Sequence, residues 1–109
     1  MTDKIVVLTT CDSEKHAAQL ARHLVEHRLA ACVNILPKAR SIYRWKENIE
    51  DASEWFLVIK SRRDLFAALR AEIQKIHTYE VPEVIAIPIV DGSEAYLGWL
   101  DAQVTAPAG

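Results

Sequence analysis

The chain has 109 residues, enough for one domain with a single core, at a size where association between subunits often adds stability. Its 13 basic and 15 acidic residues nearly balance, so no basic surplus is available for nucleic-acid binding, and no apolar run approaches the roughly 18 residues of a membrane span. Because the N-terminus lacks the basic and long apolar regions of a secretory signal and two cysteines are too few for a disulfide framework, we expect a cytoplasmic protein with reduced thiols.

The N-terminal part of the chain predicts a strand followed by a helix. The β-branched run 5–10 is typical of a buried strand, and Asp12 or Ser13 can cap the helix behind it. Apolar residues recur at helical spacing and indicate the face that packs on the core: Ala17, Leu20, Ala21, Leu24 and Val25.

The middle of the chain predicts a long hairpin. A second strand runs from 31 to 45 with a bulge or bend at Pro37, since proline cannot donate to a strand ladder. The turn is expected at 46–48, with Asn48 as the residue best able to take a positive φ. A strongly apolar third strand follows, from residue 53 or 54 to 61.

The C-terminal part predicts a second helix, a fourth strand and a short final helix. The apolar run 84–89 indicates a strand. Ser93 is placed to cap a helix over 95–103, and 105–109 is expected to be a frayed tail. The second helix, at 64–76, has an apolar stripe of Leu65, Phe66, Leu69, Ile73 and Ile76.

The order of elements, βαββαβ with one more helix, defines the fold class. Two split βαβ units make a ferredoxin-like α+β sandwich, in which two helices cover one face of an antiparallel sheet. We expect a single domain over residues 1–109, structured from about residue 3 to about residue 104.

The predicted sheet is apolar on both faces, although two helices cover only one. The runs 5–8, 55–59 and 84–89 lack the polar alternation of a strand with one face in water. At about 25 cal/mol per Å², an exposed apolar face would cost many kcal/mol, so we expect self-association, with the hairpin as an arm toward a neighbouring subunit. The expected interface includes the aromatic residues Tyr43, Trp45 and Trp55.

The connector 77–83 before the fourth strand carries an imidazole, a phenol and two carboxylates. Pro82 holds the backbone extended there, so a stiff turn presents these side chains. Imidazole and carboxylate suit Cu(II), and thiolate suits Cu(I). We therefore predict a metal site of Cys11, His77 and Glu83, provided that the two loops converge. The alternative is that Cys11 is a loop thiol and His77 a helix-terminal cation.

The same connector also predicts a small-ligand cleft. Lys60, Tyr79 and Glu83 offer an ammonium, a phenol and a carboxylate for a small anion or metabolite. We expect a binding protein rather than an enzyme, because the sequence has no G-x-S-x-G turn, no glycine-rich phosphate loop and no HExxH, and only three glycines. The enzymatic alternative is a nucleophilic pair of Cys11 and His77.

Several short motifs, in this order and spacing, resemble the CutA family of divalent-cation tolerance proteins. The match runs from about Ile5 to Leu100, most of the chain, and its landmarks are Leu29-Ala30-Ala31-Cys32-Val33-Asn34, Tyr43-x-Trp45, Ile59-Lys60-Ser61, Tyr79-x-Val81-Pro82-Glu83 and Tyr96-Leu97-x-Trp99-Leu100. The resemblance implies a homotrimer of ferredoxin-like subunits and a role in tolerance of divalent metals, copper in particular, with no established reaction. We expect Cu(II) or another divalent cation to be bound weakly.

The chain departs from the family pattern at three places. Thr9 occupies the position of a cysteine proposed as a copper ligand in some members, and Ile76 that of one histidine of a neighbouring pair. Glu47 stands where the hairpin usually has a glycine. The copper site that the resemblance implies is therefore incomplete in this chain.

The alternative function is that of a trimeric sensor similar to the PII proteins, which are also ferredoxin-like trimers. Such a sensor would bind a small anion or metabolite in a cleft between subunits. These sensors usually have a long mobile loop between the middle strands, whereas this chain has only the tight turn at 46–48. Fold alone does not separate the two functions.

Overall fold

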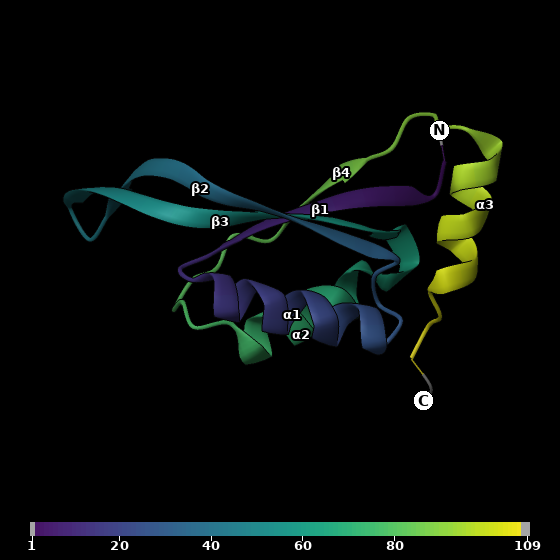
Figure 1. Ribbon diagram of the computed structural model, residues 1–109, viewed down its shortest axis with the longest axis horizontal. Coiled ribbons are helices and arrows are strands. Elements are labelled where there is room, and N and C mark those ends of the chain that lie inside the picture. The colour runs from purple at the N-terminus through teal and green to yellow at the C-terminus, as the bar shows by residue number, and fades with distance from the viewer. Residues whose placement is uncertain (1, 108–109) are drawn as a thin grey trace.

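The computed structural model describes residues 2–107, and within them four strands form one antiparallel sheet (Figure 1). The strands are β1 (Lys4–Cys11), β2 (Cys32–Trp45), β3 (Asn48–Arg62) and β4 (Ile85–Pro88), and the helices are α1 (Glu14–Glu26), α2 (Phe66–Ile76) and α3 (Glu94–Gln103). The strand order across the sheet is β2-β3-β1-β4. The predicted ferredoxin-like α+β fold is confirmed, with β1 and β3 as the inner strands.

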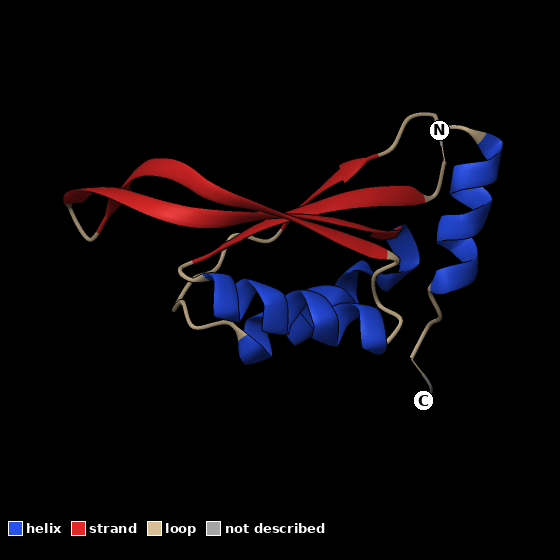
Figure 2. Ribbon diagram, in the orientation of Figure 1, coloured by secondary structure: helices blue, strands red, loops and turns tan. Residues whose placement is uncertain are grey.

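The core lies between the sheet and the layer of α1 and α2 (Figure 2). Odd-numbered residues of β1, and those of β3 from Trp55 onward, face this layer, because strand side chains alternate between the two faces. Val25, placed in the stripe of α1 by the sequence, is 41% exposed, since it lies about 100° round the helix from Leu24. The fully buried side chains come from both layers: Val7, Leu24, Leu57, Ile59, Leu69 and Ile73.

Both serine caps predicted from the sequence are confirmed. The Ser13 hydroxyl accepts the His16 N–H at 3.1 Å, and the Ser93 hydroxyl accepts the Tyr96 N–H at 3.3 Å. The second helix begins two residues later than expected, because a 3₁₀ turn over Arg63–Leu65 precedes it.

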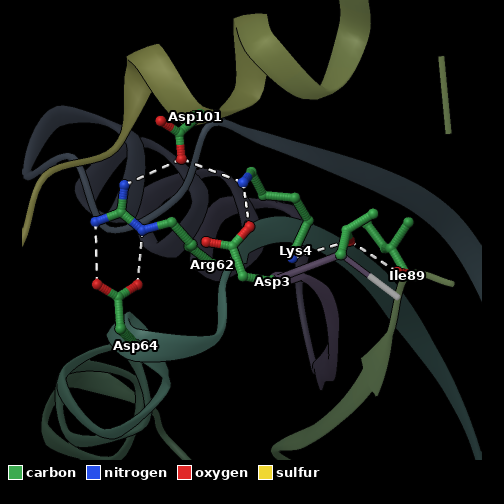
Figure 3. Close-up of polar contacts among 7 residues, drawn as sticks. Asp3, Lys4, Arg62, Asp64, Ile89 and Asp101 are labelled. Atoms are coloured by element: carbon green, nitrogen blue, oxygen red, sulfur yellow. Dashed lines mark hydrogen bonds and ion pairs between the residues drawn. The ribbon is translucent and has the colours of Figure 1, made fainter. Parts of the chain in front are cut away.

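Helix α3 packs at the end of the sheet rather than over its open face (Figure 1). A charged cluster holds it there (Figure 3): Asp101 of α3 pairs with Lys4 of β1 and with Arg62 of β3, each at 3.2 Å. These two cations lower the pKa of the Asp101 carboxyl from its usual value, through hydrogen bonds first from Lys4 and then from Arg62. Arg62 also pairs with Asp64 at 2.6 Å.

The start of the predicted frayed tail is attached to the domain. Val104 is buried, and the N–H of Thr105 donates to the Arg28 carbonyl at 3.0 Å. Residues 108 and 109 lie outside the described residues, as does residue 1. Within 2–107, none of the helices combines the length and the apolar character needed to cross a membrane.

The hairpin of β2 and β3 has the predicted bulge but a different turn. Strand register shifts between Leu36 and Ala39, where Lys38 has a φ of 61°. Trp45 pairs directly with Asn48, so the turn has two central residues, and these are Lys46 and Glu47, with φ values of 48° and 70°. Asn48 was therefore the wrong residue for positive φ. A two-residue turn of this kind needs positive φ at both central positions, and pairing places Asn48 in β3.

The second face of the sheet remains open in the single subunit. Even-numbered residues of β1 and β3 lie on it, next to residues of β2 and β4. Its apolar side chains include Leu36, Ile85 and Ile87, each about half exposed at 49%, 50% and 48%. The hairpin also extends past the helix layer (Figure 1), and its turn contacts the connector that follows α2 through Lys46, whose Nζ lies 3.5 Å from Oε2 of Glu80.

Candidate functional site

His77 directly follows α2 as its C-terminal cap, and both of its ring nitrogens are engaged within the chain. Nδ1 lies 3.0 Å from the backbone nitrogen of Tyr79, whose N–H must donate to it. Nε2 therefore carries the ring proton and donates to the Thr10 carbonyl at 2.7 Å. Neither nitrogen has a free lone pair for a metal ion in this arrangement. The imidazole instead ties the end of α2 to the end of β1.

Cys11 is the last residue of β1, so the alternative that it is a loop thiol is wrong. Its side chain is buried, with Sγ 3.8 Å from His77 Nε2. Burial raises the pKa of the Cys11 thiol to about 11, and the charges of Asp12 and Glu54 add to the shift. The thiol is thus protonated at neutral pH, and only the thiolate is a good metal ligand or nucleophile.

The predicted metal set does not converge. Cys11 and His77 are neighbours beside a small hollow of about 70 Å³, but Glu83 lines a different groove. Within residues 2–107, no group of three His, Cys, Asp or Glu side chains is arranged to hold a metal ion.

Thr9 does not complete this set. It is fully buried and its hydroxyl has no hydrogen-bond partner within the described residues, but it does not line the hollow beside Cys11. The metal ligands that remain are one protonated thiol and one imidazole with both nitrogens engaged. These groups do not fit a tightly bound copper ion.

A larger groove of about 700 Å³ lies between the hairpin and the connector that follows α2. Tyr43 and Trp45 line it from β2, and Tyr79 and Glu83 from the connector. Its other lining residues are Thr10, Ser41, Ile42, Glu54, Thr78, Glu80 and Val81. The size is that of an ordinary small-molecule site.

Glu54 is the one charged residue in the lining of this groove that the sequence did not identify as part of a site. It is only 4% exposed, and its Oε2 accepts a hydrogen bond of 2.6 Å from the hydroxyl of Tyr79. Burial, together with the neighbouring Glu54 carboxylate, raises the pKa of Tyr79 far above its ordinary value, so the phenol keeps its proton and remains a donor. The signal in the sequence was a lone carboxylate that directly precedes the apolar run of β3.

Lys60 does not belong to the predicted cleft with Tyr79 and Glu83. It lies on the open face of the sheet, paired in register with Cys32 and Val6, and its ammonium donates to the side chain of Asn34. The groove therefore has three glutamates, and none of its lining residues is a lysine, an arginine or a histidine. Such a lining disfavours the small anion expected from the sequence.

The three aromatic residues predicted at a subunit interface separate into two groups. Tyr43 and Trp45 are 42% and 38% exposed on the hairpin. Trp55 instead packs against the core, because the alternation of β3 turns it toward the helix layer. The burial of Trp55 thus needs no partner subunit.

The fold and the groove together define a ferredoxin-like protein with an acidic, aromatic cleft beside a long hairpin. The family described as "CutA1 divalent ion tolerance protein" matches residues 5–103. The chain belongs to this family, and the resemblance seen in its motifs is confirmed.

Similar proteins come from distant organisms. "Protein CutA" of Mus musculus is 49% identical over 96 residues, which are 88% of this chain and 54% of the mouse protein, so the chain spans about half the length of that relative. "Divalent-cation tolerance protein CutA" of Thermus thermophilus is 45% identical over 87% of this chain and 92% of its own length.

Solved structures agree with this assignment. The crystal structure of CutA1 from Oryza sativa has a TM-score of 0.92 and 38% identity, and the match covers 95% of each chain. The structure of the divalent cation tolerance protein from Thermus thermophilus has a TM-score of 0.91 and 42% identity, over 94% of this chain and 99% of that one.

Proposed function

We propose that this protein supports tolerance of divalent cations as a cytoplasmic homotrimer that binds its ligand rather than converting it. Its membership of a divalent ion tolerance family, over residues 5–103, supports the link to metal ions. The observation that best supports the proposed assembly into a trimer is the open second face of the sheet.

The open face favours a symmetric assembly of sheets. Leu36, Ile85 and Ile87 are each about half exposed on it, and α3 packs elsewhere. Covering apolar surface gains about 25 cal/mol per Å², and a chain of this size obtains much of its stability in this way. Tyr43 and Trp45 on the extended hairpin are suited to reach a neighbouring subunit.

Binding without catalysis is supported by the state of the nucleophile candidates. Cys11 is a buried thiol with a pKa raised to about 11. His77 donates to the Thr10 carbonyl instead of accepting a proton from Cys11. A nucleophilic pair would need the opposite arrangement, with the thiol proton pointing at a free ring nitrogen.

Copper is held weakly in this proposal. A Cu(II) ion can bind Nε2 of His77 only after this nitrogen gives up the proton that it donates to the Thr10 carbonyl, and the loss of that hydrogen bond lowers the affinity.

Two measurements test the proposal. Sedimentation equilibrium at micromolar concentration should give the mass of three subunits, and a monomer would contradict it. Deleting the gene in its source organism should lower the copper concentration at which growth stops, and returning the chain should restore it. Unchanged tolerance in the deletion strain would remove the metal function.

A further inference from the structure

The groove between the hairpin and the connector has a consistent chemical character. Its charged lining residues are Glu54, Glu80 and Glu83, and its largest walls are the rings of Tyr43, Trp45 and Tyr79. Carboxylates attract cations, and aromatic faces do the same through their quadrupoles. The lining therefore selects a guest with positive charge and some apolar surface.

Glu54 provides the strongest evidence for a positively charged guest. It is 4% exposed, and within residues 2–107 its carboxylate has a single hydrogen bond, from the neutral phenol of Tyr79 to Oε2. A carboxylate that is so little exposed to solvent normally has a cation or several hydrogen-bond donors around it. Among the described residues its second oxygen has no such partner and is not fully enclosed by protein, and Glu54 lines the groove. A cation in the groove would supply the missing charge.

The rim of the groove already holds an ammonium group of the chain itself. Nζ of Lys46 lies 5.4 Å from the centroid of the Trp45 ring and 3.5 Å from Oε2 of Glu80. An alkylammonium thus contacts an indole face and a carboxylate of the lining at the same time. This contact has the geometry that a guest ammonium would use deeper in the groove.

A bare metal ion fits this groove poorly. The glutamates line one groove, but no three acidic, histidine or cysteine side chains of the described residues converge on a point where one ion could sit. The groove measures about 700 Å³, far larger than one ion needs. Separated carboxylates and aromatic walls match a flexible molecule with several ammonium groups joined by methylene segments.

We propose that this groove binds an aliphatic di- or polyamine, a ligand beyond the proposed role in metal tolerance. One ammonium group pairs with Glu54, and a second pairs with Glu83 or Glu80 at the rim. The methylene segments between them lie against Tyr79 and against those faces of Tyr43 and Trp45 that line the groove, and the rest of these two exposed rings is left for contact with a neighbouring subunit.

Calorimetric titration with spermidine tests the proposal, using the intact assembled protein in about 0.15 M NaCl to screen diffuse charge effects. We expect saturable binding with one site per subunit. Glu54→Gln should weaken binding at least about tenfold, since a buried charge pair is lost, while its amide oxygen still accepts from Tyr79. Glu83→Gln, nearer the rim, should weaken it severalfold. Glu26→Gln on α1 removes the same charge from the opposite layer and should leave affinity unchanged.

Three results would overturn the proposal. The first is the absence of saturable spermidine binding. The second is an affinity for spermidine that is the same in the Glu54→Gln, Glu83→Gln and Glu26→Gln proteins, or displacement of spermidine by Mg²⁺ at equal concentration of charge. Either result would mean that spermidine is attracted only by the net charge of the protein. The third is spermidine binding that occurs only after the assembly is dissociated. That result would mean that a cationic side chain of a neighbouring subunit fills the groove in the assembled protein. Melting of each variant separates lost binding from lost folding, and none of these results depends on copper.

Discussion

The hydroxyl of Tyr79 donates a hydrogen bond of 2.6 Å to the carboxylate of Glu54, which is 4% exposed. This contact joins the connector after α2 to the middle of β3, 25 residues away along the chain. Both residues line the groove, so the position of the connector and the charge inside the groove depend on the same pair.

Tyr79→Phe should destabilise the protein by about 1–3 kcal/mol, because the buried Glu54 carboxylate loses its hydrogen bond. Chemical denaturation at constant protein concentration measures the change. Tyr96→Phe is the matched control, since Tyr96 is 43% exposed on α3. Equal stability of the two variants would mean that water satisfies Glu54 as well as the phenol does.

The charged cluster at α3 predicts a loss of stability in acid. The folded-state pKa of Asp101 is lowered by Lys4 and Arg62, so its contribution is fully present above the unfolded value of about 3.9 and is lost as pH falls through the lower, folded value. Asp101→Asn should therefore be less stable than the parent at pH 7 and should approach it below about pH 3. Denaturation curves at both pH values measure this difference. If the difference in stability between the parent and the variant stays constant with pH, or does not decrease in about 1 M salt, the ion-pair explanation is contradicted.

Ile87→Glu should dissociate the proposed trimer, because it places a charge on the open face of the sheet, where Ile87 is 48% exposed in the single subunit. Val25→Glu introduces the same charge at a position of similar exposure, 41%, on α1, and should leave the mass unchanged. Sedimentation equilibrium distinguishes the two. A trimer that persists in the Ile87→Glu protein would place the interface elsewhere.

His77→Ala should abolish the weak Cu(II) binding that we propose, while His27→Ala, at an exposed position at the C-terminal end of α1, should retain it. Binding to the parent should fall as pH falls, because the imidazole must be unprotonated to ligate. Titration calorimetry at several pH values measures both effects. Copper affinity that survives in the His77→Ala protein would assign the ligands to other side chains.

Local patterns were sufficient for most of the secondary structure. Ser13 and Ser93 cap helices because a serine oxygen can satisfy a free backbone N–H wherever a helix begins, and Pro37 marks a bulge because it cannot donate to a ladder. The positive φ of the turn was assigned to the wrong residue, since the register of Trp45 with Asn48 depends on the whole hairpin.

The sequence by itself determined the order of elements, the two-sided apolar sheet and the family, because these follow from periodicity and from ordered motifs. Only the tertiary structure decided which candidate side chains meet. In the folded chain Cys11 is buried next to His77, and Lys60 lies away from Tyr79. The Tyr79 hydroxyl instead donates a hydrogen bond to Glu54. Strand alternation predicts the face on which a side chain lies, but the path by which the connector after α2 returns across the hairpin depends on long-range packing that no local pattern records.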